Sequence, residues 1–194
     1  MVTVSTSISP ARAYHHGDLR SALVEAGLKA LETTAIADLS LRQLARDVGV
    51  SATAVYRHFP DKQALMSALA TEGIEQLGRF QQQAASDAAD NSLAFAATGR
   101  AYVRFALANP ALFRLIFSQC GPVGPAIFGD NLAARLLQQR ADAATGHDPE
   151  ATRQLMIQAW AVVHGLAMLM LDQQLPADDA LIDRVIDPAT LFPR

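Results

Sequence analysis

The chain has 194 residues, a net charge of −3 at pH 7, and 51% apolar against 18% charged residues. No uninterrupted apolar run reaches the roughly 20 residues of a membrane span, and the N-terminus lacks the basic start and apolar core of a signal peptide. The single cysteine, Cys120, excludes an internal disulfide. These features predict a soluble cytoplasmic protein with one medium domain, or with a small domain joined to a larger one.

The first part of the chain reads as an arm followed by four helices. Residues 1–13 are rich in Ser and Thr and lack periodicity, so we expect a flexible arm. Ser40, Ser51 and Asp61 are expected N-caps, and Gly49 is the expected left-handed end of the second helix. The predicted helices run over residues 17–32, 41–48, 52–59 and 62–83.

The second part of the chain is also predicted to be helical. Ser92 and Asp148 are expected caps, and Pro149 suits the first turn of a helix. A Gly/Pro loop over residues 120–129 interrupts the pattern. The predicted helices run over residues 92–108, 110–117, 127–144, 150–175 and 178–186. We therefore predict an all-α fold of about nine helices.

Two apolar stripes at helical spacing mark the two short helices: Leu41, Leu44, Ala45 and Val48 on the first, and Val50, Val55 and Phe59 on the second. Helices of two turns are marginal alone, so these two must pack on each other and on the first helix. The tight turn at Gly49 makes this a helix-turn-helix arrangement. With Val55 and Phe59 turned inward, the residues between them face outward, on the side that such helices place in the major groove of DNA.

Small side chains at residues 52–54 allow a close approach to DNA, where Thr53 can reach a base edge. Tyr56, His58 and Lys62 can reach phosphate oxygens, and Arg42 suits a bidentate contact with guanine. No acidic residue lies between residues 50 and 60, although residues 84–194 carry the whole acid excess. The candidate DNA-binding residues are Arg42, Ser51, Ala52, Thr53, Tyr56, Arg57, His58 and Lys62.

The run LRQLARDVGVSATAVYRHFPDKQALM, which begins at Leu41, closely resembles the N-terminal DNA-binding domain of the TetR family of bacterial transcriptional regulators. The resemblance extends over residues 14–77 and implies a DNA-binding domain there, followed by a helical effector-binding and dimerisation domain over 78–194. Position 53 is often Gly or Ala in that family, whereas this chain has Thr. The resemblance implies DNA contacts by Arg42, Thr53, Tyr56, His58 and Lys62.

The run YHHGDLRSAL, from Tyr14, and the run WAVVHG, from Trp160, are similar to a TetR subgroup with a Trp-His-Gly signature. Trp160 and His164 are four residues apart and therefore share a helix face. An apolar stripe of this kind is also typical of a plain core, with His164 as a hydrogen-bonded core residue. The candidate ligand-binding residues are Phe105, Phe113, Phe117, Met156, Trp160, His164 and Met168.

The long and the final predicted helices are apolar over much of their surface, which favours burial against a second subunit. The family resemblance likewise implies a homodimer through the C-terminal helices, bound to a palindromic operator. We find no nucleophile with a base, no phosphate loop and no metal-ligand spacing, so we expect no enzyme activity, cofactor or metal. The sequence predicts a repressor released from double-stranded DNA by a small apolar or aromatic effector. The alternatives are a helical carrier without a DNA role, and a DNA-binding regulator without a ligand.

Overall fold

The computed structural model describes residues 19–86, 88–118 and 129–188. Within these ranges the chain forms nine α-helices and one short 3-10 helix, without a strand, which confirms the all-α prediction. In chain order they are α1 (Leu19–Leu31), η1 (Ile36–Asp38), α2 (Leu41–Val48), α3 (Ala52–His58), α4 (Lys62–Ala85), α5 (Asn91–Ala108), α6 (Pro110–Ser118), α7 (Leu132–Ala144), α8 (Pro149–Leu171) and α9 (Asp179–Val185).

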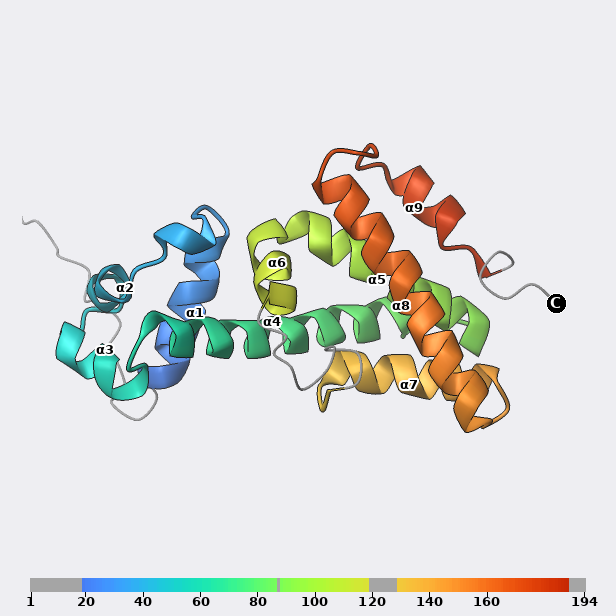
Figure 1. The fold of residues 1–194 in the computed structure, drawn as a ribbon, viewed down its shortest axis with the longest axis horizontal. Helices are drawn as coiled ribbons and strands as arrows, with labels where there is room; N and C mark the ends of the chain where they lie inside the picture. The colour runs from blue at the N-terminus through green and yellow to red at the C-terminus, as the bar shows by residue number, and fades with distance from the viewer. Residues whose placement is uncertain (1–18, 87, 119–128, 189–194) are drawn as a thin grey trace, which may run out of the picture.

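Figure 1 shows an elongated molecule in which α1, α2 and α3 form one end and α5 to α9 form the other. The long helix α4 runs between the two ends and packs on α1 at its start and on α5, α6 and α7 further along. The boundary predicted after residue 77 lies inside α4, so this helix belongs to both units. The predicted arm over residues 1–13, Cys120 and the loop over 120–128 lie outside the described residues.

Several predicted helix ends are confirmed and others are wrong. Ser51 and Asp61 accept backbone N–H bonds as caps of α3 and α4. Ser40 precedes α2 but makes no side-chain cap bond. Asp90, not Ser92, caps α5, because its carboxylate accepts from the third residue of the helix at 2.8 Å. Asp172 caps the C-terminus of α8, which ends four residues earlier than predicted.

Helices α2 and α3 pack against each other and against α1, as their apolar stripes predict. Leu44, Val55 and Phe59 are at most 1% exposed, whereas Val48 and Val50 at the ends of the stripes are half-buried. Gly49 ends α2 with φ 77°, and the N–H of Val50 then donates to the carbonyl of residue 45 at 2.8 Å. This left-handed turn ends α2 and lets the chain change direction before α3 begins.

We expect Gly49→Ala to lower the free energy of unfolding by about 1 kcal/mol, because a Cβ is strained at positive φ. A Cβ at this position would meet no atom within 4 Å, so the cost is purely conformational. Gly49→Asn is the matched control and should lose less, since Asn tolerates the left-handed region. Urea denaturation measures both, and equal stability of Gly49→Ala and wild type would contradict the assignment.

The second half of the molecule is built around α5, which packs on α4, α7, α8 and α9. Helix α4 approaches α6 and α7 closely at two glycines: a Cβ on Gly73 would lie 2.7 Å from a methyl of Leu112, and one on Gly78 2.7 Å from Leu132. Arg104 of α5 holds α9 through ion pairs with Asp179 and Asp183 at 2.8 and 3.0 Å. Helix α4 is therefore in direct contact with α6 and α7 at these two glycines.

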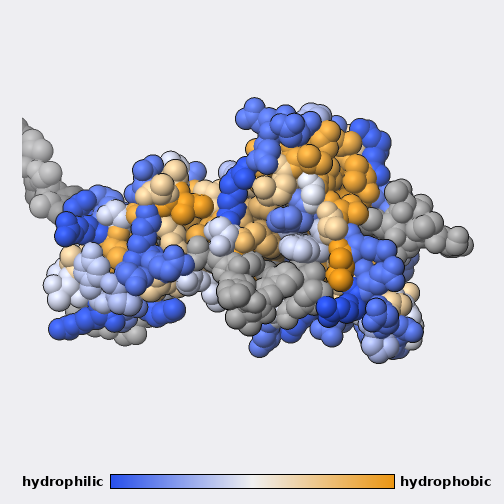
Figure 2. Space-filling model, in the orientation of Figure 1, coloured by the Kyte–Doolittle hydropathy of each residue, from blue (hydrophilic) through white to orange (hydrophobic). Residues whose placement is uncertain are grey.

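Helix α8 is strongly apolar, although only part of its surface is buried within the subunit. Its 23 residues include a window of mean hydropathy 1.5, long and apolar enough by composition to cross a bilayer, but only 28% of that window is buried. The core helix of a soluble protein passes the same test, and α8 packs on α5 and α7 through its inward face. Figure 2 shows apolar surface along α8, whereas the end formed by α1 to α3 is mainly hydrophilic. Ile157 and Leu169 are exposed on this helix.

Candidate DNA-contact surface and ligand cavity

The outer face of α3 carries most of the residues predicted to contact DNA. Val55 and Phe59 are buried, which leaves the polar residues of the helix turned away from α1 and α2. Tyr56 is 43% exposed, so its ring and hydroxyl are accessible on this face. The exposed members of the predicted set are Arg42, Ser51, Thr53, Tyr56, Arg57 and His58, while Ala52 and Lys62 are half-buried.

Two of these residues also have structural roles. The hydroxyl oxygen of Ser51 accepts from the N–H of Ala54 at 3.2 Å, and its own proton remains able to donate. The Nζ of Lys62 donates to the carbonyl of Ala37 at 2.5 Å, which ties the start of α4 to η1. An ammonium has three protons, so Lys62 can hold this carbonyl and still reach a phosphate.

Arg20 is a basic residue of this region that lies outside the predicted set. It is exposed on α1, and its guanidinium lies 5.4 Å from the centre of the Phe59 ring. Stacking on an aromatic face holds an arginine in a defined position. No sequence signal links Arg20 to Phe59, because the contact joins residues 39 positions apart.

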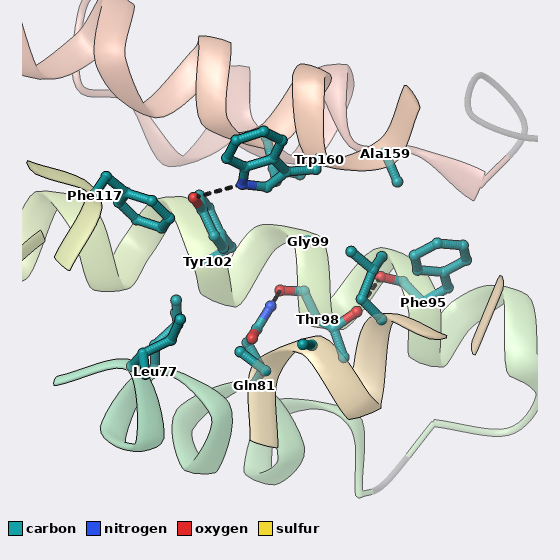
Figure 3. Close-up of a pocket in the computed structure, with 14 residues that line it drawn as sticks. Leu77, Gln81, Phe95, Thr98, Gly99, Tyr102, Phe117, Ala159 and Trp160 are labelled. Atoms are coloured by element: carbon teal, nitrogen blue, oxygen red, sulfur yellow. Dashed lines mark hydrogen bonds between the residues drawn. The ribbon is translucent and has the colours of Figure 1, made fainter. Parts of the chain in front are cut away.

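A cavity of about 50 Å³ lies between α4, α5, α6, α7 and α8. Figure 3 shows Tyr102 and Trp160 at one end of it and Phe95 at the other, with Leu77 and Gln81 on the α4 side. The lining is mainly apolar with a few polar groups, as is usual for small-molecule sites. The lining residues are Ile74, Leu77, Gln81, Phe95, Thr98, Gly99, Tyr102, Phe117, Ala133, Ala134, Leu137, Ala159, Trp160 and Val163.

The structure brings four of the predicted ligand residues together and leaves three apart. Phe117 and Trp160 line the cavity, and His164 stacks between them and Phe113, with ring centres 4.8 to 5.6 Å apart. Of the seven predicted residues only Phe117 and Trp160 line the cavity; Phe113 and His164 lie beside them, and the other three are packed elsewhere. Phe105 packs against Phe80, Met156 packs behind Phe95, and Met168 is packed against the main core.

Tyr102, which is absent from the predicted set, connects this aromatic cluster. The indole N–H of Trp160 donates to the Tyr102 hydroxyl oxygen at 3.2 Å, and that hydroxyl lies 2.9 Å from Nδ1 of His164. Since the tryptophan N–H can only donate, the tyrosine proton is available for Nδ1. This arrangement favours neutral His164 with its proton on Nε2. Burial also lowers the pKa of His164 below its ordinary value of 6.5.

We expect the pKa of His164 to make the protein less stable in mild acid. Because the unfolded chain binds a proton at His164 more readily than the folded chain, stability is lost as the pH falls below about 6.5. His164→Gln keeps an acceptor for the Tyr102 hydroxyl but does not titrate, so it should lose less stability between about pH 7 and pH 5. Urea denaturation across this range measures the difference, and identical pH profiles would contradict a depressed pKa.

Among residues 19–86, 88–118 and 129–188, no three His, Cys, Asp or Glu side chains gather as a metal site.

Two family models match the chain, and together they cover both units of the structure. Residues 23–69 match the model described as bacterial regulatory proteins of the tetR family. Residues 95–189 match the model described as the C-terminal domain of tetracyclin repressor-like proteins. The first match contains α2 and α3, and the second contains most helices around the cavity. The second model does not identify the narrower Trp-His-Gly subgroup, which stays a prediction.

Solved structures resemble the chain over nearly its whole length. A protein of unknown function from Rhodococcus sp. RHA1 is 32% identical, with a TM-score of 0.74 over 93% of this chain and 95% of that one. A tetR-family transcriptional regulator from Streptomyces coelicolor is 17% identical, with a TM-score of 0.60 over 89% and 79%. The repressor AlkX from a Dietzia strain, implicated in biodegradation of n-alkanes, is 17% identical, with a TM-score of 0.59 over 91% and 96%. The last two similarities concern the fold alone.

Proposed function

Because the chain belongs to the TetR family of bacterial regulatory proteins, we propose that it is a dimeric, cytoplasmic repressor that leaves its operator when a small apolar or aromatic ligand enters the cavity. Residues 14–77 would bind DNA, and residues 78–194 would bind the ligand and dimerise, with α4 shared by both. The observation that carries the proposal is the outer face of α3, where exposed Tyr56, Arg57 and His58 follow one another above a closed core.

Docking of α3 in the major groove accounts for the side chains on this face. Ala52 and Thr53 lie at the start of the helix, where small groups let the backbone approach the bases. Tyr56, Arg57 and Lys62 lie further along and can bind phosphates, which fix the register of the protein on DNA. The net negative charge of the chain does not oppose this, because charges beyond about 10 Å are screened at 0.1 M salt.

The exposed face of α8 supports a homodimer. Ile157, Ala161, Gly165 and Leu169 recur every four residues opposite the buried face, so they form one outward stripe that also borders Gln158. A Cβ on Gly165 would meet no atom within 4 Å, so no described helix of the same subunit crosses closely there. A close crossing at Gly165 would therefore involve a second subunit. A two-fold dimer places two α3 helices on the half-sites of a palindrome.

The path from the cavity to DNA runs through α4 and α6. Leu77 and Gln81 of α4 line the cavity, and the same helix begins at Lys62, four residues after α3 ends. Phe117 of α6 lines the cavity too, and α6 packs on α4 at Gly73 and on α1. A ligand that widens the cavity would shift α4 and α6 and change the spacing of the two α3 helices. By linkage it must prefer the state that fits DNA poorly.

The test is a mobility-shift assay of the full chain on the DNA upstream of its own gene, at low and high salt. We expect a specific complex whose affinity falls steeply with salt concentration, since both subunits contact phosphates. Random DNA of the same length is the control. Equal affinity for both DNAs would overturn the proposal and favour a helical carrier without a DNA role. Specific DNA binding that no cavity ligand weakens would favour a DNA-binding regulator without a ligand.

A further inference from the structure

Gln81 places an unpaired hydrogen-bond acceptor at the cavity. The residue is 8% exposed, and its Nε2 donates to the carbonyl of Thr98 at 3.1 Å. Its Oε1 is buried and has no partner. The amide orientation is fixed by this bond. If the amide were flipped, Oε1 would face the Thr98 carbonyl oxygen, and two acceptors cannot form a hydrogen bond. Figure 3 shows this amide on the cavity side of α4, between Leu77 and Thr98.

A buried amide oxygen without a donor is unfavourable, because folding removes its water without replacing the hydrogen bond. Most such groups in proteins have a partner, and those that line a cavity acquire one from water or a ligand. The neighbouring polar groups of the lining cannot serve. The Thr98 hydroxyl already donates to the carbonyl of Phe95, and the Trp160 N–H donates to Tyr102. These two lining groups therefore leave Gln81 Oε1 without a donor, and a molecule inside the cavity can supply one.

The lining selects against charged molecules. None of its described residues is Lys, Arg, His, Asp or Glu. An ion buried there would lose its hydration without gaining an opposite charge. The start of α7, which could attract an anion, is already occupied, since the Glu75 carboxylate accepts from the N–H of Leu132 at 3.2 Å. The ligand should therefore be neutral.

The shape of the cavity selects for a small apolar body. Phe95, Phe117 and Trp160 supply aromatic walls, while Ala133 and Ala159 leave space between the helices. A volume of about 50 Å³ holds only a few water-sized groups, at roughly 10–15 Å³ for each. A single ring would enter only with some movement of the side chains, which is what a release signal requires.

We propose that the cavity binds a small neutral molecule with a single ring as its apolar body and one hydroxyl or N–H group, whose proton Gln81 Oε1 accepts. The proposal rests on the proposed function in so far as this molecule is the effector. Gln81 thus determines specificity: molecules of the same shape without a donor leave its oxygen unpaired and bind more weakly.

The experiment compares matched pairs of probes by calorimetric titration of the full chain: phenol against toluene, and cyclohexanol against methylcyclohexane. We expect the donor-bearing member of at least one pair to bind wild type tenfold or more tightly than its partner. Gln81→Met removes the acceptor at similar volume and should abolish the preference. Gln82→Met makes the same change on the exposed side of α4 and should keep it. Benzoate should not bind either protein.

Two results would overturn the proposal: equal binding within both pairs, or a preference that survives in Gln81→Met. Failure of all four probes to bind would overturn it as well, because each probe carries the single neutral ring that the proposal requires. The melting temperature of ligand-free Gln81→Met should equal or exceed that of wild type, and a large fall would instead make Gln81 a structural residue. Donor-selective binding that leaves DNA affinity unchanged would reject the repressor-release function but not the ligand class.

Discussion

Ala161→Glu is expected to turn the dimer into a monomer and to weaken operator binding by about 10²–10⁴-fold. The residue is exposed on α8 in the middle of the stripe that ends at Ile157 and Leu169. In a symmetric dimer the two glutamates would face each other across a close apolar contact, where neither has a partner for its charge. A monomer binds one half-site at a time. It therefore loses the increase in affinity that two linked DNA-binding domains give the dimer.

Sedimentation of the variant measures the oligomeric state, and a mobility shift on the operator measures the affinity. Ala84→Glu is the matched control, since it makes the same change at an exposed position of α4. The fold of the single chain should survive in both variants, because Ala161 is not part of the core. A variant that stays dimeric would place the subunit interface on another face of the molecule.

Arg57→Ala is expected to weaken binding to all DNA by about 10- to 100-fold. Each dimer presents this guanidinium twice, and a charge-assisted hydrogen bond contributes roughly 1.5–3 kcal/mol before screening by salt reduces it. Removal of two phosphate contacts should also lower the slope of affinity against salt concentration by about 2. Stability should hardly change, because Arg57 is exposed at the end of α3.

The slope is measured by fluorescence anisotropy on operator and random DNA at several salt concentrations. Arg135→Ala is the control with the same charge change. Arg135 is exposed on α7, far along the chain from α3, and it pairs with Asp130. If both variants lost the same DNA affinity, Arg57 would act through the net charge of the protein and not through a direct phosphate contact.

The DNA-binding prediction follows from sequence spacing, whereas the dimer prediction depends on tertiary packing. Arg57 lies in a segment whose outward face follows from the spacing of Val55 and Phe59. Ala161 lies on a helix that is predicted to be apolar over much of its surface, and only the packed structure shows which face α5 and α7 leave uncovered. The first prediction could therefore be made from sequence, and the second needed the tertiary structure.

The helical fold and the helix-turn-helix unit could be predicted from the sequence, because both depend on local features. Apolar residues three or four positions apart define a buried face, Ser51 and Asp61 bond to amides three residues away, and Gly49 meets a backbone requirement at its own position. The exposed positions of Tyr56, Arg57 and His58 follow from the same spacing. Where the local signal was ambiguous, as for Ser92 against Asp90, the prediction was wrong.

The position of the cavity and the residues that form it could not be predicted, because both depend on how distant helices pack together. Its lining comes from five helices, and the bond from Tyr102 to His164 joins residues 62 positions apart. Periodicity assigns a residue to a face but not to a neighbour on another helix, so Phe105 and Met168 looked equivalent to Phe117 and Trp160. The unpaired oxygen of Gln81 had no sequence signal, because a missing partner is a property of everything packed around it.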